Sequence, residues 1–118
     1  MGASFRELIV WQRAIQLTAE IYRYTASFPR SEQFGLTNQM RRAAVSVASN
    51  TAEGYGRATK GEYVQFLGHA RGSVCELQTQ LAIAETLGFG TSGGRKSAEG
   101  FAIEVSRMLN ALMTKLKT

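Results

Sequence analysis

Apolar side chains recur every three or four residues along most of this chain, as they do on one face of an α-helix. Ser4 and Glu7 have the spacing of a capping box, so the first helix is expected to begin there. Phe28 and Pro29 end it, because the residue before a proline avoids the helical region. The apolar stripe expected for this helix is Leu8, Trp11, Ile15, Thr18, Tyr22 and Thr25. It is widened by Ile9, Val10, Leu17 and Ile21, so the helix is expected to have more than one apolar side.

A second helix is predicted after Pro29, with Gly54 and Gly56 as its natural end. Many of its side chains are small, which lets a neighbouring helix approach closely. Its inward face is expected to be Leu36, Met40, Ala43, Val47, Asn50 and Gly54, with Ala44, Ala48 and Ala52 beside them.

The third helix opens with Thr59 and Glu62, a second capping box, and Gly88 is suited to end it in the left-handed conformation. Its inward stripe is Tyr63, Phe66, Leu67, Ala70, Val74, Leu77, Leu81, Ala84 and Leu87. The next stretch, GFGTSGGRKS, is predicted to be a loop because it is rich in glycine and small polar residues. A fourth helix is expected from about Ala98, with Phe101, Val105, Met108, Leu109, Leu112 and Leu116 facing inward.

These four amphipathic segments predict one all-α domain over residues 1–118, an antiparallel up-and-down four-helix bundle. The apolar stripes are wider than one bundle core requires, so Ile9, Val10, Phe34 and Val64 are expected on the outside. A large exposed apolar surface points to self-association. The alternative is that these residues cover the ends of loops.

Basic residues outnumber acidic ones by 14 to 9, which gives a net charge of +5. This balance favours polyanionic partners such as nucleic acid, although charge alone fits a merely soluble basic protein equally well. No apolar run approaches the roughly 18 residues of a membrane span, and no signal-peptide pattern opens the chain. A cytoplasmic protein without a membrane partner is therefore expected. The candidate nucleic-acid contacts are Arg41, Arg42, Arg57, Lys60, Arg95 and Lys96.

The motifs support neither a P-loop, nor a metal site, nor a cysteine nucleophile. Gly56 and Gly61 have P-loop spacing, but Glu62 follows where that motif needs a lysine. His69 is the sole histidine and cannot form a metal site with Cys75, six residues away, on one helix face. Cys75 itself is expected to be a buried, inert thiol, and no nucleophile motif surrounds it. We therefore expect no cofactor and no metal.

Polar residues form a strip along the second helix, and a similar strip follows the third. In an up–down pair Arg42 would lie near Glu76, and Asn50 and Glu53 near the start of the third helix. Buried polar groups must be paired, because an orphan costs roughly 1–3 kcal/mol. We interpret the strips as a structural hydrogen-bond network; the alternative is an acid/base pair, Glu53 and Glu76. The residues of the predicted network are Arg42, Asn50, Glu53, Ser73 and Glu76.

Three segments carry the most distinctive residues: FRELIVWQRAIQLTAEIY, FGLTNQMRRAAVSVASNTAEGYGR and EYVQFLGHARGSVCELQTQL. Within them lie an Asn-x-x-Glu-Gly and a Gly-Ser-x-x-Glu pattern, here Asn50, Glu53, Gly54 and Gly72, Ser73, Glu76. On these segments and this spacing, the chain resembles the four-helix bundle family of 23S rRNA intervening-sequence proteins. The resemblance runs nearly end to end.

The resemblance implies a fold similar to the accessory variability protein of diversity-generating retroelements. That relative is a barrel-shaped homopentamer that binds nucleic acid and a reverse transcriptase. No catalytic activity is implied. The expectation is thus a basic homopentamer, not an enzyme, that binds RNA or DNA through backbone electrostatics. The alternative is a scaffold or accessory factor for a protein such as a reverse transcriptase, with no direct nucleic-acid role.

Overall fold

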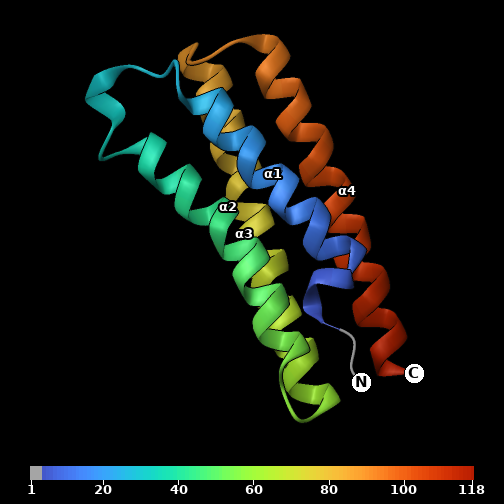
Figure 1. The fold of residues 1–118 in the computed structure, drawn as a ribbon. Helices are drawn as coiled ribbons and strands as arrows, with labels where there is room; N and C mark the ends of the chain where they lie inside the picture. The colour runs from blue at the N-terminus through green and yellow to red at the C-terminus, as the bar shows by residue number, and fades with distance from the viewer. Residues whose placement is uncertain (1–3) are drawn as a thin grey trace.

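Four long helices form an antiparallel bundle in the computed structural model, which describes residues 4–118 (Figure 1). They are α1 (Ile9–Thr25), α2 (Leu36–Tyr55), α3 (Lys60–Leu87) and α4 (Ser92–Lys117), with short 3₁₀ helices η1 (Phe5–Glu7) and η2 (Arg30–Glu32). No strand occurs in this part of the chain. The predicted all-α, four-helix fold is confirmed, while the first three residues of the predicted domain lie outside the described ones.

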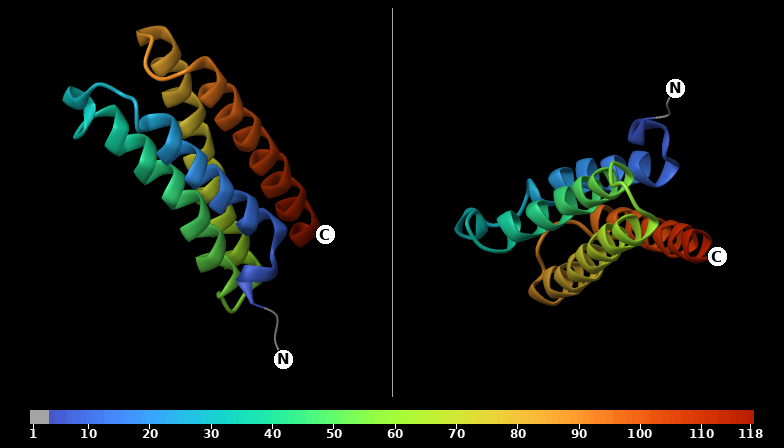
Figure 2. Two further views of the ribbon diagram at one scale, coloured as in Figure 1. Left: turned by 45° about the horizontal axis from the view of Figure 1, so that its top comes forward. Right: turned by 90° about the horizontal axis from the view of Figure 1, so that it is seen from below.

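Each helix packs on its sequence neighbours, and α1 also packs on α4. Within residues 4–118 the backbones of α1 and α3 do not approach each other closely, so these two helices lie diagonally across a bundle of 45 × 20 × 19 Å. The views in Figure 2 agree that the chain runs up and down, with neighbouring helices antiparallel. None of the helices in the described part of the chain combines the length and the apolarity that crossing a membrane requires.

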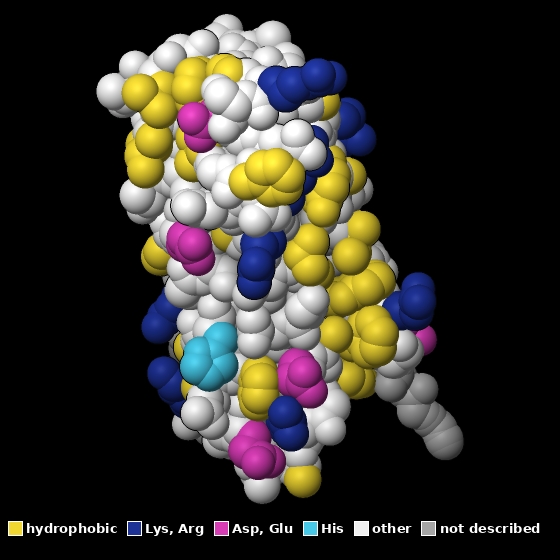
Figure 3. Space-filling view, turned by 90° about the vertical axis from the view of Figure 1, so that its left-hand side faces the viewer, with side chains coloured by type: hydrophobic (Ala, Val, Ile, Leu, Met, Phe, Trp, Pro, Cys, Tyr) yellow, Lys and Arg dark blue, Asp and Glu magenta, His cyan; other side chains and the backbone are white. Residues whose placement is uncertain are grey.

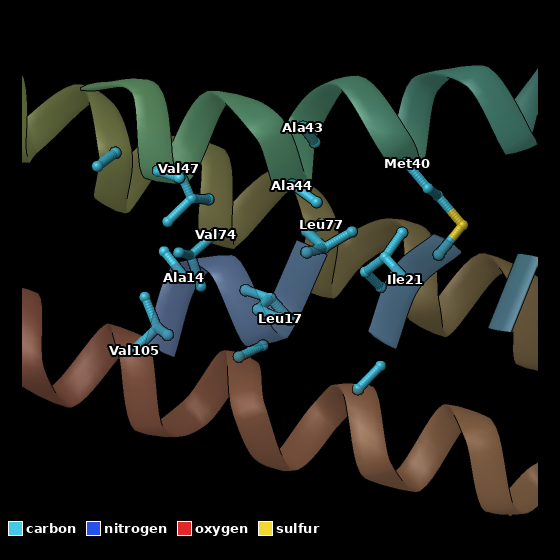
Figure 4. Close-up of a cluster of buried hydrophobic side chains, with 14 of the residues drawn as sticks. Ala14, Leu17, Ile21, Met40, Ala43, Ala44, Val47, Val74, Leu77 and Val105 are labelled. Carbon is cyan, nitrogen blue, oxygen red and sulfur yellow. The ribbon is translucent and has the colours of Figure 1, made fainter. Parts of the chain in front are cut away.

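The core lies along the bundle axis and is made mainly of leucine, valine and alanine (Figure 4). Leu17 of α1, Met40 of α2 and Leu77 of α3 are completely buried. Burying each such side chain contributes about 1.5–3 kcal/mol. Ala14 and Ala44 in Figure 4 let the backbones of α1 and α2 approach closely.

The buried face of α1 is formed mainly by residues that were expected only to widen the predicted stripe. Ile15 and Tyr22 are 43% and 44% exposed, whereas Ala14, Leu17 and Ile21 are completely buried. Two apolar stripes of helical period overlap in this segment. The small Ala14 side chain lets α1 pack on α2 and α4 at once, which selects the second stripe. For the same reason Val10, which was expected outside, is only 5% exposed.

The start of α1 also differs from the predicted capping box. The Ser4 hydroxyl accepts a hydrogen bond from the Arg6 amide at 3.1 Å, which caps η1 rather than an α-helix. The α-helix begins only at Ile9, after Leu8 adopts an extended conformation. At α3 the N-cap half of the predicted box is confirmed, since the Thr59 hydroxyl accepts from the Glu62 amide at 3.1 Å. The Glu62 carboxylate accepts from the Thr59 hydroxyl at 3.3 Å rather than from the Thr59 amide.

The predicted GFGTSGGRKS loop is mostly helix, because α4 begins at Ser92 rather than near Ala98. The Thr91 hydroxyl accepts from the Gly94 amide at 3.0 Å and so caps the first turn. A Cβ atom at position 94 would lie 3.0 Å from the Tyr24 ring. Gly94 is therefore explained by close packing of α4 on α1, not by a flexible loop.

Two further residues lie on a different side than predicted. Cys75 is exposed, because Val74 and Leu77 take the buried face of α3 at this level. Leu87 is 55% exposed in the last turn of α3. The chain reverses at Gly88, which has the expected left-handed φ of 74°, and Phe89 then packs on Phe28 with ring centroids 5.6 Å apart.

Removing the Thr91 hydroxyl is expected to destabilise the protein. Thr91→Ala leaves a donor of the first turn of α4 without its side-chain partner, which should cost about 0.5–2 kcal/mol of unfolding free energy. Thr114→Ala makes the same chemical change at an exposed α4 position and should be neutral or slightly stabilising. Urea denaturation followed by circular dichroism measures both. Equal stability of the two variants would contradict the capping role.

Candidate nucleic-acid interface

A short polar seam joins α2 to α3. The hydroxyls of Ser46 and Ser73 lie 2.9 Å apart across the two helices. The side-chain amide of Asn50 donates to both the carbonyl and the hydroxyl of Ser46 at 2.9 Å. Ser46 therefore connects two members of the predicted network, Asn50 and Ser73. Only the Ser46–Ser73 bond crosses between the helices, and it favours this register of α2 against α3 because a one-turn slip would break it.

The other three members of the predicted network do not join this seam. Glu53 pairs instead with Arg57, one turn along the same chain, at 3.3 Å. Glu76 accepts a hydrogen bond from Gln80 at 3.2 Å. The expected Arg42–Glu76 ion pair is absent from the described residues, although both side chains line one groove. Arg42 is exposed, so water solvates its charge and no buried partner is required.

Glu53 and Glu76 are too far apart to act on one bond. Glu53 lies in the last turn of α2, beside the start of α3. Glu76 comes 16 residues after the start of α3 at Lys60, about 24 Å along the helix axis. The geometry therefore does not assemble these two carboxylates into an acid/base pair.

The glycine that follows Glu53 has a packing role. A Cβ atom at Gly54 would lie 2.9 Å from the Cβ of Phe66, so only glycine lets the end of α2 touch α3. The rings of Tyr55 and Tyr63 meet edge to face at 6.0 Å in the same corner. Burial raises the pKa of the Tyr63 phenol above its ordinary value. This corner is thus a close-packed joint between helices.

Three of the six candidate cations are engaged by the fold. Arg95 is only 16% exposed and pairs with Glu85 at 3.4 Å and Glu99 at 3.6 Å. The Arg57 guanidinium, besides its ion pair, lies 4.5 Å from the centre of the Phe66 ring. Arg41 donates to the Thr25 hydroxyl at 2.9 Å. Of the three, Arg95 is the least available to a partner.

The other three candidates, Arg42, Lys60 and Lys96, are exposed and form no side-chain hydrogen bond or ion pair with any described residue. Lys60 begins α3 at one end of the bundle, and Lys96 lies in the second turn of α4 at the other. Arg42 lies between them on α2. Figure 3 shows basic side chains spaced down one face of the bundle, with exposed hydrophobic side chains between them.

Two grooves flank Arg42, each about 440 Å³ in volume. The first is lined by Phe34, Asn38, Gln39, Arg42, Ala43, Ser46 and Glu76. The second is lined by Tyr22, Asn38, Arg41, Arg42, Val45 and Ser46. Asn38 and Gln39 were not among the predicted site residues. The four-residue spacing of Asn38 from both Phe34 and Arg42 was visible in the sequence but did not indicate an exposed polar groove.

Exposed apolar side chains gather in two other places. A hollow of about 270 Å³ between α1 and α2 is lined by Trp11, Ile15, Thr18, Val45, Ala48, Ser49 and Ala52. A second hollow of similar volume, on α3, is lined by Thr79, Ala82, Ile83, Thr86 and Leu87. Of the residues expected outside, Ile9 and Phe34 are 55% and 86% exposed, and Val64 is half-buried.

The described residues contain no group of three or more histidine, cysteine or acidic side chains that could hold a metal ion. His69 instead meets the ring of Phe66 edge to face at 5.7 Å. The histidine is therefore explained by an aromatic contact at the surface.

Comparison with known proteins identifies relatives of this four-helix architecture. A model of the family described as 23S rRNA-intervening sequence protein matches residues 6–111. The chain also resembles the crystal structure of a protein with unknown function from the S23 ribosomal protein family of Bacteroides thetaiotaomicron VPI-5482, with a TM-score of 0.80 and 16% sequence identity. That likeness covers 89% of this chain and 98% of the other, and it shows the fold alone. None of the curated proteins compared with the chain matches it.

Proposed function

This chain belongs to the 23S rRNA-intervening sequence protein family, and from that premise we propose that it is a basic, non-catalytic homo-oligomer that binds RNA or DNA through the phosphate backbone. The observation that carries the proposal is the surplus of cations without an acidic partner. Only four of the 14 basic side chains, Arg13, Arg23, Arg57 and Arg95, form ion pairs among the described residues, which leaves ten without one. Cations without a carboxylate partner are free to replace the counterions of nucleic-acid phosphates.

Binding is expected to weaken steeply as salt is added. Fluorescence anisotropy with labelled RNA and DNA measures the slope of log affinity against log salt, which reports the number of phosphates neutralised. Arg42→Gln, Lys60→Gln and Lys96→Gln should each reduce that slope by about 1 per contact. Arg23→Gln is the matched control, because it removes the same charge from a side chain already paired with Glu20 at 2.7 Å.

Two results would speak against the proposal. The first is no binding to any RNA or DNA at low salt. The second is an equal effect of Arg23→Gln and Arg42→Gln, which would show that only net charge matters.

The homo-oligomer is supported by the two apolar hollows on different faces. A closed ring such as the proposed pentamer needs two different surfaces on each subunit, because only a two-fold axis joins a surface to itself. The hollow between α1 and α2 and the hollow on α3 supply such a pair. The first hollow lies between α1 and α2 and the second on α3, which is diagonal to α1, so one face can meet the next subunit while the other meets the previous one.

The same apolar surface favours a second candidate function, a scaffold or accessory factor that binds another protein such as a reverse transcriptase. Such a partner would occupy one of the hollows in place of a second copy of this chain. Affinity capture after nuclease treatment separates the two functions. Recovery of a protein partner, together with no affinity for RNA or DNA, would favour the scaffold.

A further inference from the structure

We infer that the groove formed by Phe34, Asn38, Gln39, Arg42 and Glu76 binds unpaired bases of single-stranded nucleic acid, with Phe34 as the stacking ring. This inference rests on the proposed function and adds to it a form of nucleic acid and a base contact. Backbone electrostatics alone would treat single strands, duplexes and base-free strands alike, apart from their charge density. An aromatic ring beside an unpaired arginine adds a contact that only an accessible base can make.

The ring of Phe34 is displayed to solvent from a fixed backbone. It is 86% exposed, more than any other large hydrophobic residue described. The turn that carries it is held by Glu32, whose carbonyl accepts from the Gly35 amide at 3.0 Å and whose carboxylate accepts from the Leu36 amide at 3.1 Å. A Cβ atom at Gly35 would lie 3.0 Å from that carboxylate. The ring is therefore presented at little cost in ordering when a base stacks on it.

The polar side chains beside the ring have unused hydrogen-bonding capacity. Asn38, Gln39 and Arg42 form no side-chain hydrogen bond or ion pair with described residues. Two free amides and a guanidinium match the edges of a base and an adjoining phosphate. The groove volume of about 440 Å³ lies within the range of about 300–1,000 Å³ found for small-molecule sites.

One acidic side chain determines which side of the groove the base occupies. Glu76 lines the same groove and accepts only the bond from Gln80. Its carboxylate repels phosphate but accepts hydrogen bonds from base amino groups. The base edge is thus expected on the Glu76 side and the phosphate on the Arg42 side.

The second groove continues the path beyond Arg42. Arg42 borders both grooves, and the Arg41 guanidinium lies 4.5 Å from the centre of the Tyr22 ring in the second one. A single-stranded nucleic acid that extends from Phe34 past Arg42 would reach a second aromatic and cationic pair, Tyr22 and Arg41. Alternating aromatic rings and cations are the features by which proteins bind single strands without sequence preference.

The test compares single strands that carry bases with a strand that lacks them and with a duplex. Fluorescein-labelled poly(U), poly(dT), an abasic oligomer with the same number of phosphates and a duplex are titrated by anisotropy against the full chain. The wild type should bind the two base-carrying single strands more tightly than the abasic strand. Phe34→Ala should weaken binding to them by about 5- to 140-fold while leaving abasic binding unchanged. Phe34→Tyr keeps a ring and should retain the preference.

Ile103→Ala, which shortens another exposed apolar side chain on α4, is the control and should change no affinity. Equal binding of every probe, with no effect of Phe34→Ala, would overturn the stacking inference and leave the proposed function standing. No binding of any probe would overturn both. A fall in the light-scattering mass of Phe34→Ala together with lost binding would make Phe34 a contact between copies, and that too would overturn the inference.

Discussion

Replacing Gly90 by alanine is expected to lower the free energy of unfolding by about 2–5 kcal/mol, a large fraction of the stability of a small domain. Two costs add at this position. Gly90 has a φ of 74°, which strains any residue with a Cβ atom. That Cβ atom would also lie 2.5 Å from the Tyr24 ring and 3.0 Å from the Phe28 ring. Both rings are buried, so they cannot move aside without disturbing the core.

Substitutions at two other glycines allow the backbone cost and the contact cost to be measured separately. Gly88 has the same φ of 74° but no atom within 4 Å of its would-be Cβ, so Gly88→Ala should show the backbone cost alone, about 1–2 kcal/mol. Gly72 lies inside α3 with open space around it, so Gly72→Ala should stabilise the protein by about 0.5–1 kcal/mol. Urea denaturation measures all three. Equal losses for Gly88→Ala and Gly90→Ala would show that the contact with the rings costs nothing.

The same corner explains why the start of α4 was mispredicted. Glycines and small polar residues between Gly88 and Ser97 have the composition of a loop. The structure uses them for close approach instead, since the Tyr24 hydroxyl donates to the carbonyl of Phe89 at 3.0 Å beneath this segment. Burial raises the pKa of the Tyr24 phenol. Composition cannot distinguish a flexible glycine from one that faces a ring of another helix.

The helices could be predicted from the sequence, but the face that each one buries could not always be. The bounds of α3 followed from the Thr59 cap and from Gly88, because caps are local signals. On α1 both Ile15 and Leu17 belong to stripes of helical period. Which of the two stripes is buried depends on where α2 and α4 lie in the folded bundle. The residue pattern of a single helix does not contain that information.

The candidate site was predictable to a similar extent. Residue spacing put Asn50 near the start of α3 and Ser73 near Arg42, whereas the structure joins Asn50 and Ser73 through Ser46. The spacing could not show that Arg95 pairs with Glu85, because the Glu85 side chain reaches it from a different helix. Nor could it show the groove beside Arg42, whose walls come from the turn before α2, from α2 itself and from α3.

The largest effect on assembly is expected from a glutamate placed in either apolar hollow. Ile15 and Ile83 are each 43% exposed, one in the hollow between α1 and α2 and the other in the hollow on α3. In the proposed ring both become buried between subunits. An unpaired carboxylate there costs several kcal/mol, so Ile15→Glu and Ile83→Glu should each reduce the mass in light scattering to that of the 12.9 kDa monomer.

Mixing the two variants tests whether the two hollows meet each other. Ile15→Glu keeps its α3 hollow and Ile83→Glu keeps its α1–α2 hollow, so one intact interface remains possible between them. An equimolar mixture should therefore form a heterodimer and stop there, because the other two faces carry glutamates. Ile103→Glu, at a 46% exposed position on α4 outside both hollows, should leave the oligomer unchanged. If the mixture stays monomeric while each variant retains its helical circular dichroism, the two hollows do not form one interface, and the subunits must associate by a different pair of surfaces.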